Sequence, residues 1–165
     1  MPQEFNMLNA LKFAIQTEKD VMDLYKHAAS IIKNPRGKKV FEQLAGEEAE
    51  HVGHLFKVYS GKDFGSMADF LKSPPQVDLK TIRQLDQALS NNAHERKAME
   101  LASNLEQALA KSLYLTASHI VDPSVRTVFE RLAKETENHF AVIESEYAHF
   151  MAMVHETDID IYVRE

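Results

Sequence analysis

Apolar residues recur at every third or fourth position along four long stretches of the chain, and this spacing predicts four long helices. The first stretch, Asn9–Lys33, ends at Asn34-Pro35, because the residue before a proline avoids the helical region of backbone conformation. Pro35 can itself occupy the first turn of a helix, so a second helix is predicted from there to about Tyr59. Ser60-Gly61 supplies the stop signal of that helix.

After a long connection at residues 60–93, the second half of the chain repeats this organisation. The elements predicted from the connection onward are two short helical pieces and two long helices, over Ser66–Leu71, Asp78–Leu89, His94–Val121 and Pro123–Val154. Asp122-Pro123 separates the two long helices, as Asn34-Pro35 does in the first half. Apolar residues alternate with polar ones after Glu156, which predicts an extended tail to Glu165.

The two halves are related by an internal repeat. A shift of 88 positions aligns residues 10–59 with residues 98–147 without a gap, and fifteen of these fifty positions are identical. The identical pairs include Glu18/Glu106, Pro35/Pro123, Glu47/Glu135 and His51/His139. We interpret the repeat as a duplicated helical hairpin. One hairpin cannot bury its own apolar faces but two can, so we expect an all-α, ferritin-like four-helix bundle. It would form a single domain, residues 1–165, with residues 60–93 as its one long crossover.

Polar residues interrupt the apolar stripe near the middle of each long helix. They are Glu18 in the first helix, Glu48 and His51 in the second, Glu106 in the third, and Thr136 and His139 in the fourth. A buried carboxylate without a partner is costly, and three at one level also repel one another. A divalent cation removes both penalties, and Glu-x-x-His places two ligands on one helical face. Glutamates from two helices with Glu-x-x-His from the other two form the site of di-iron and di-manganese bundles, so we expect a metal pair here.

The composition excludes several other classes of protein. The chain has no cysteine, which excludes disulfides, zinc ribbons, cysteine-bound iron–sulfur clusters and thiol catalysis, and is compatible with a reducing cytoplasm. The formal net charge of −6 gives no overall positive field to attract nucleic acid. No apolar run approaches the ~18 residues of a membrane span, and the N-terminus lacks the pattern of a signal peptide. We therefore expect a cytoplasmic protein that binds neither nucleic acid nor membrane.

Two motifs of the first hairpin carry a resemblance to a known family. They are Ala10-Leu11-x-x-Ala14-Ile15-x-x-Glu18, followed by Tyr25, and Pro35-x-Gly37-Lys38-x-x-Phe41-x-x-Leu44-Ala45-x-Glu47-Glu48-x-x-His51. The chain resembles the rubrerythrin family of ferritin-like proteins over about residues 8–60 and 96–150. The resemblance implies a non-haem di-iron centre, with manganese or zinc as other metals, that reduces hydrogen peroxide or oxidises ferrous iron.

The resemblance also implies a role for each candidate site residue. Glu18 and Glu106 would be terminal ligands, Glu48 would bridge the two metals, and His51 and His139 would each cap one metal. The three glutamates are then the candidate catalytic residues. The resemblance further implies a homodimer.

Two features depart from the family pattern. The fourth helix reads Thr136-Glu137-Asn138-His139, so the second bridging carboxylate is missing, and the second metal would be weakly held, bridged by water or absent. Glu135 lies one helical turn before His139, but its repeat mate Glu47 indicates a flanking position. These 165 residues also contain no cysteine-rich rubredoxin module. Electrons would then come from a separate protein, such as a rubredoxin-like one, or from a small reductant.

Three functions therefore stay open. The first is an oxidoreductase that meets oxidative stress by consuming peroxide or oxygen. The second is an iron- or manganese-binding protein without turnover, which Thr136 supports. The third is a degenerate structural bundle whose buried glutamates are protonated, against which the intact Glu48-x-x-His51 argues. Tyr25 has two interpretations, as a hydrogen-bond donor to a site carboxylate or as a core residue.

Overall fold

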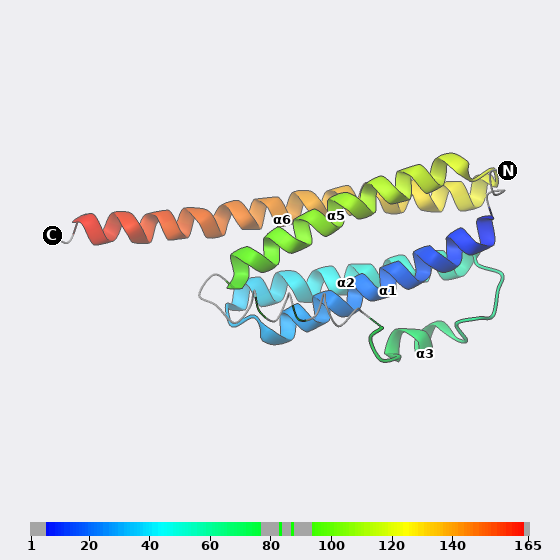
Figure 1. The fold of residues 1–165 in the computed structure, drawn as a ribbon, viewed down its shortest axis with the longest axis horizontal. Helices are drawn as coiled ribbons and strands as arrows, with labels where there is room; N and C mark the ends of the chain where they lie inside the picture. The colour runs from blue at the N-terminus through cyan, green and yellow to red at the C-terminus, as the bar shows by residue number, and fades with distance from the viewer. Residues whose placement is uncertain (1–5, 77–82, 84–86, 88–93, 164–165) are drawn as a thin grey trace.

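The computed structural model describes residues 6–76, 83, 87 and 94–163. The helices in this part of the chain are α1 (Met7–Ile31), α2 (Pro35–Val58), α3 (Met67–Lys72), α5 (His94–His119) and α6 (Pro123–Val163), and these residues contain no strand. The four long helices form two hairpins, α1 with α2 and α5 with α6, and α3 lies in the crossover between them (Figure 1). The prediction of an all-α, ferritin-like bundle is confirmed.

The two hairpins use the same local device to begin their second helix. The side chain of Asn34 accepts hydrogen bonds from two backbone N–H groups in the first turn of α2, and Pro35 occupies the first helical position. The side chain of Asp122 accepts two equivalent hydrogen bonds at the start of α6, which begins with Pro123. Each side chain satisfies N–H groups that the helix itself leaves unpaired. The prolines therefore separate the helices as the sequence predicted.

The extended tail predicted after Glu156 is wrong, because α6 continues without a break to Val163. No proline or glycine follows Pro123, so nothing in the backbone chemistry interrupts the helix. The end of α6 extends past the other helices (Figure 1). The short helix predicted over Asp78–Leu89 lies almost entirely outside the described residues. Within the described part of the chain, no helix is both long and apolar enough to cross a membrane.

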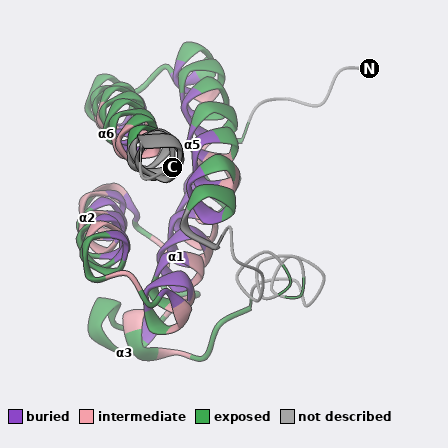
Figure 2. Ribbon diagram, turned by 90° about the vertical axis from the view of Figure 1, so that its left-hand side faces the viewer, coloured by how far each residue is buried: buried purple, intermediate pink, exposed green. Residues whose placement is uncertain are grey.

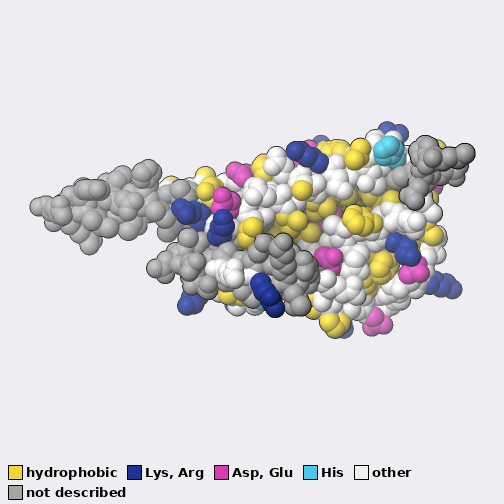
Figure 3. All heavy atoms as spheres, in the orientation of Figure 1, with side chains coloured by type: hydrophobic (Ala, Val, Ile, Leu, Met, Phe, Trp, Pro, Cys, Tyr) yellow, Lys and Arg dark blue, Asp and Glu magenta, His cyan; other side chains and the backbone are white. Residues whose placement is uncertain are grey.

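The hydrophobic core fills the space between the four long helices, and their buried faces point toward one another (Figure 2). Among the core side chains with almost no exposed surface are Ile15, Phe41, Met99 and Leu132, one from each long helix. Each such side chain contributes roughly 1.5–3 kcal/mol by its removal from water. Apolar side chains also reach the surface along the junction of α1 with α5 (Figure 3). The core holds the midpoints of the helices at one level, which positions the polar residues described below.

A buried ion pair connects the crossover to α1. Lys19 and Asp23 lie one turn apart on α1, are both buried, and pair with each other. The ammonium nitrogen of Lys19 also donates to the backbone carbonyl of Ser73, 3.1 Å away, and lies 5.9 Å from the ring centroid of Phe70 on α3. Lys19 thus holds the end of α3 against α1.

Replacement of Lys19 by methionine should lower the free energy of unfolding by about 3–5 kcal/mol, because Asp23 then stays buried without its partner. The double variant Lys19→Met/Asp23→Leu should recover most of this loss, since no unpaired charge remains. Urea unfolding followed by circular dichroism measures both values. If the single and the double variant lose equal amounts of unfolding free energy, the ion pair does not hold α3 against α1.

Candidate metal centre

Five candidate ligands meet at the middle of the bundle. Glu18 comes from α1, Glu48 and His51 from α2, Glu106 from α5 and His139 from α6. All five are buried, with exposed fractions between 0% and 5%. On α2 the two side chains share one helical face because they are three residues apart. The structure therefore brings together every residue that the sequence predicted as a metal ligand.

The ligand atoms form two groups that share Glu48. Glu18, Glu48 and His51 make one group, which we call the first half-site, and Glu48, Glu106 and His139 make the other, the second half-site. Within each group the ligand atoms lie within 4.8 Å of one another. Oε2 of Glu48 is 3.4 Å from Nδ1 of His51, and Oε1 of Glu48 is 3.2 Å from Nδ1 of His139. Glu48 thus offers one oxygen to each half-site.

The three carboxylates lack the hydrogen bonds that burial demands. One oxygen of each has no hydrogen-bond partner, namely Oε1 of Glu18, Oε2 of Glu48 and Oε2 of Glu106. A buried acceptor without a partner costs about 1–3 kcal/mol, and more when the group is charged. A cation next to these oxygens would remove the cost, and carboxylate oxygens with imidazole nitrogens suit divalent iron, manganese or zinc. The residues present therefore fit a metal pair.

Protons stabilise these groups in the absence of a metal. Burial, followed by the charge of Glu48, raises the pKa of Glu18 well above its usual range, and burial also raises the pKa of Glu106. Burial opposes protonation of His51, but hydrogen bonds with Glu18 and Glu48 outweigh it and raise the pKa of His51 to about 11. Against the same effect of burial, Glu106 and Glu48 raise the pKa of His139 to about 10. A metal that binds here must displace these protons.

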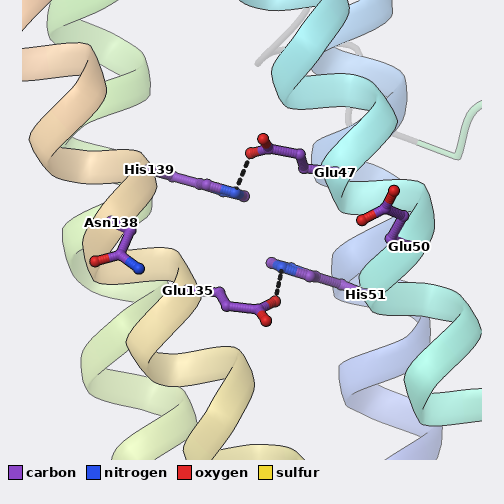
Figure 4. A pocket seen from close by; sticks show the side chains of 6 residues that line it. All are labelled: Glu47, Glu50, His51, Glu135, Asn138 and His139. Atoms are coloured by element: carbon purple, nitrogen blue, oxygen red, sulfur yellow. Dashed lines mark ion pairs between the residues drawn. The ribbon is translucent and has the colours of Figure 1, made fainter.

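The outer nitrogens of the two histidines are held by glutamates of the opposite hairpin (Figure 4). Nε2 of His51 is 2.9 Å from Oε2 of Glu135 on α6, and Nε2 of His139 is 2.5 Å from Oε2 of Glu47 on α2. The two imidazole rings stack with 5.2 Å between centroids and 6° between planes. A carboxylate on the outer nitrogen fixes the orientation of a histidine ligand and makes it more basic. This crossed arrangement directs both Nδ1 atoms toward the buried carboxylates.

A polar pocket of about 260 Å³ lies on the outer side of these rings (Figure 4). Its lining consists of three pairs related by the internal repeat, Glu47/Glu135, Glu50/Asn138 and His51/His139. Glu50 and Asn138 are exposed, whereas the histidines are buried. The imidazole rings therefore separate this solvent-facing pocket from the carboxylates behind them.

Tyr25 is both a core residue and a hydrogen-bond donor, so the two interpretations of the sequence both hold. Its ring is 1% exposed and lies 5.6 Å from the ring of Phe41. Its hydroxyl donates to Oε1 of Glu106, 2.6 Å away. Burial, followed by the charge of Glu106, raises the pKa of Tyr25 well above its ordinary value. The hydroxyl therefore keeps its proton and remains a donor at neutral pH.

Thr136 occupies the position that the repeat relates to Glu48, and it offers no ligand atom to the centre. The side chain is fully buried, and its hydroxyl donates to the backbone carbonyl of Leu132, 2.7 Å away. Glu135 does not replace the missing carboxylate, because its Oε2 pairs with the outer nitrogen of His51. Each half-site therefore has two carboxylates, one of them shared, and one histidine.

Sequence reasoning placed Glu47 and Glu135 only at the flank of the site. Each lies four residues before a histidine, and the internal repeat duplicates this spacing, which is the signal that could have identified them. That spacing predicts a contact with the histidine of the same helix. The observed partner belongs to the other helix, because α2 and α6 pack with their midpoints at one level.

Metal affinity should rise with pH, because metal binding displaces the protons of His51 and His139. In the folded protein the pKa of His51 is about 11 and that of His139 is about 10, and both lie above the pKa of an unfolded histidine. The stabilisation that these protons give the metal-free protein is complete below pH ~6.5 and is lost as the pH rises through the folded-state values. The two imidazole protons alone would make the apparent affinity for the metal pair rise by about a hundredfold per pH unit near neutrality. Calorimetric titration with a divalent metal in buffers of different ionisation enthalpy counts the protons, and release of none would contradict this assignment.

Glu135→Gln and Glu47→Gln should each weaken metal binding by about 10–100-fold, because the amide no longer fixes the histidine in its basic, correctly oriented form. Glu50→Gln is the matched control, since Glu50 lines the same pocket without contacting either imidazole in the structure. Competition with a metal-binding indicator dye measures the affinities. Equal affinities in the Glu135 and Glu50 variants would show that the crossed pairs do not position the ligands.

Comparison with known proteins agrees with this geometry. Residues 9–147 match the family model described as Rubrerythrin, and this range covers most of both hairpins and all five candidate ligands. No curated protein and no solved structure matches the chain. Because the family match covers far more than half of the 165 residues, the chain belongs to the rubrerythrin family.

Proposed function

We propose that this protein is a non-haem di-iron oxidoreductase that reduces hydrogen peroxide, or oxidises ferrous iron with oxygen or peroxide. The observation that carries the proposal is the pair of buried half-sites joined by Glu48, with an unsatisfied oxygen on each of the three carboxylates. Such oxygens are costly without a cation. Membership of the rubrerythrin family supports iron as the metal.

The residues of the chain prepare the site for this chemistry. A bound ferrous pair would supply one electron per metal to the oxidant. Glu18, Glu48 and Glu106 supply oxygen ligands from three different helices, and burial keeps bulk water away from them. Glu47 and Glu135 hold the histidine ligands in place. Return to the ferrous state needs an external reductant, for which we propose a rubredoxin-like protein or a small reductant.

The second candidate function is iron or manganese binding without turnover. Thr136 favours it, because the position related to Glu48 contributes no carboxylate to the centre. A site with fewer carboxylates neutralises less of the positive charge of an oxidised metal pair. This candidate function predicts stable metal binding without oxidation of the metal by peroxide. A degenerate bundle without metal is the third outcome, in which protons alone neutralise the carboxylates.

The deciding measurement is the metal content per chain after anaerobic loading with ferrous iron and desalting, followed by peroxide consumption with a chemical reductant. We expect about two irons per chain and turnover of peroxide. Two irons without turnover would establish the binding function instead, and no iron, manganese or zinc would leave the structural bundle.

The matched variants for this test are Glu48→Gln and Glu42→Gln. Glu48→Gln should lower the iron content to one or fewer per chain, because both half-sites share this residue. Glu42 is exposed on the same helix, so its variant should load as the unchanged protein does. Circular dichroism checks that both variants are folded. Full loading of the Glu48 variant would contradict the proposed bridging role.

A further inference from the structure

The internal repeat places matching ligands around the centre but not matching neighbours. Glu18 and Glu106 are repeat mates, and so are His51 and His139. Tyr25, which donates to Glu106, has the apolar Leu113 as its repeat mate. Leu113 is buried, with 4% of its surface exposed, and has no hydroxyl to donate. The two terminal carboxylates therefore differ in their environment although their positions are equivalent.

The hydrogen bond from Tyr25 engages one of the two oxygens of Glu106. Oε1 of Glu106 accepts this bond, and Oε2 is the oxygen without a partner. Tyr25 is not one of the clustered ligands, so a cation that binds among them does not replace its hydrogen bond to Oε1. A hydrogen bond to a charged acceptor also draws negative charge away from it. The oxygen of Glu106 that lies 3.7 Å from Nδ1 of His139 therefore shares its negative charge with the Tyr25 hydroxyl.

Glu18 keeps both of its oxygens for a cation. Its Oε1 has no partner, and its Oε2 lies 3.4 Å from Nδ1 of His51. That contact joins two ligand atoms of the same half-site, so a cation between them replaces it. In the described part of the chain, the side chains within hydrogen-bond reach of Glu18 are those of its fellow ligands Glu48 and His51. No outside donor therefore competes for Glu18.

The two half-sites consequently differ in how many of their carboxylate oxygens are free of a donor from outside the site. The first half-site offers Glu18, whose oxygens accept from no donor outside the half-site, together with Oε2 of Glu48 and Nδ1 of His51. The second half-site offers Oε1 of Glu48, Nδ1 of His139 and Glu106, whose Oε1 lies 3.7 Å from that Nδ1 and is shared with the Tyr25 hydroxyl. A divalent ion binds more tightly where more anionic oxygens are available. An ion with fewer protein ligands keeps more positions for small molecules.

From these contacts we propose that the half-sites are inequivalent. The first half-site binds the tighter metal ion, and the second half-site holds the weaker ion and provides the open position for a small anionic or oxidant ligand. The part of this inference that concerns the oxidant rests on the proposed function. The difference in affinity does not, because it concerns only the binding of divalent metal.

The affinities are measured by titrating the metal-free full-length protein with Co²⁺ under anaerobic conditions, followed by calorimetry and visible absorption. We expect two steps whose affinities differ by at least about tenfold, the effect of one hydrogen bond to a charged group. Two steps of equal affinity would overturn the inference and leave the proposed function standing. Absence of any binding would overturn both.

Glu18→Gln and Glu106→Gln are a matched pair, because the two residues occupy equivalent positions in the repeat and are both fully buried. Each variant should bind one ion. The Glu106 variant should keep the affinity of the tighter step, whereas the Glu18 variant should keep only the weaker one. The reverse assignment, or equal affinities in the two variants, would overturn the inference.

Tyr25→Phe tests the cause of the difference. It removes the hydroxyl and leaves the ring, so Oε1 of Glu106 becomes free and the weaker step should tighten by about tenfold while the tighter step is unchanged. Tyr59→Phe is the control, since the hydroxyl of Tyr59 bonds to Asp63, which belongs to neither half-site. Unchanged steps in the Tyr25 variant would contradict the role given to its hydroxyl.

Azide locates the open position. We expect azide to change the visible absorption of the protein loaded with two equivalents of Co²⁺, and to leave the protein loaded with one equivalent nearly unchanged. A full azide effect at one equivalent would place the open position in the first half-site and overturn this part of the inference. A loss of the effect in Glu106→Gln, which lacks the second ion, is the confirming result.

Discussion

The burial of three carboxylates at one level of the bundle is the constraint on which the rest of the structure depends. Glu18, Glu48 and Glu106 have no exposed surface, and each has an oxygen without a hydrogen-bond partner. Such a cluster is unfavourable when ionised and unpaired, so protons or cations must neutralise it. The apolar core around it supplies the stability that allows this cost. The same cost favours the binding of a cation among these carboxylates.

The duplicated hairpin explains how the site is held in place. The two hairpins present equivalent faces to each other. A side chain of α2 that contacts α6 therefore has a counterpart on α6 that contacts α2. The crossed pairs Glu47–His139 and Glu135–His51 are the result, and they join the hairpins at the level of the ligands. The same contacts therefore join the two hairpins and orient the histidines.

The two halves have diverged at a few positions in and around the site. Thr136 removes one carboxylate from the centre, and Tyr25 gives Glu106 a donor that the repeat does not provide for Glu18. Lys19 and Asp23 bind the crossover to the first hairpin. The repeat places equivalent ligands in both half-sites, and the proposed difference between the half-sites rests on these few diverged positions.

Much of the fold could be predicted from the sequence, because helical periodicity, proline breaks and an internal repeat are local signals. The all-α bundle, the two hairpins and the group of five candidate ligands all follow from these signals. The extended tail after Glu156 was predicted wrongly, because alternation over a few residues is a weak signal when nothing breaks the preceding helix.

The sequence by itself determined which residues lie on the buried stripes, since the spacing along a helix decides which side chains share a face. Only the tertiary structure decided which of them meet. The partners of His51 and His139 on their outer nitrogens, the acceptor of the Tyr25 hydroxyl and the division of Glu48 between two half-sites all depend on contacts between helices. Those contacts follow from the rotation and relative height of packed helices, which many residues fix together and no single spacing records.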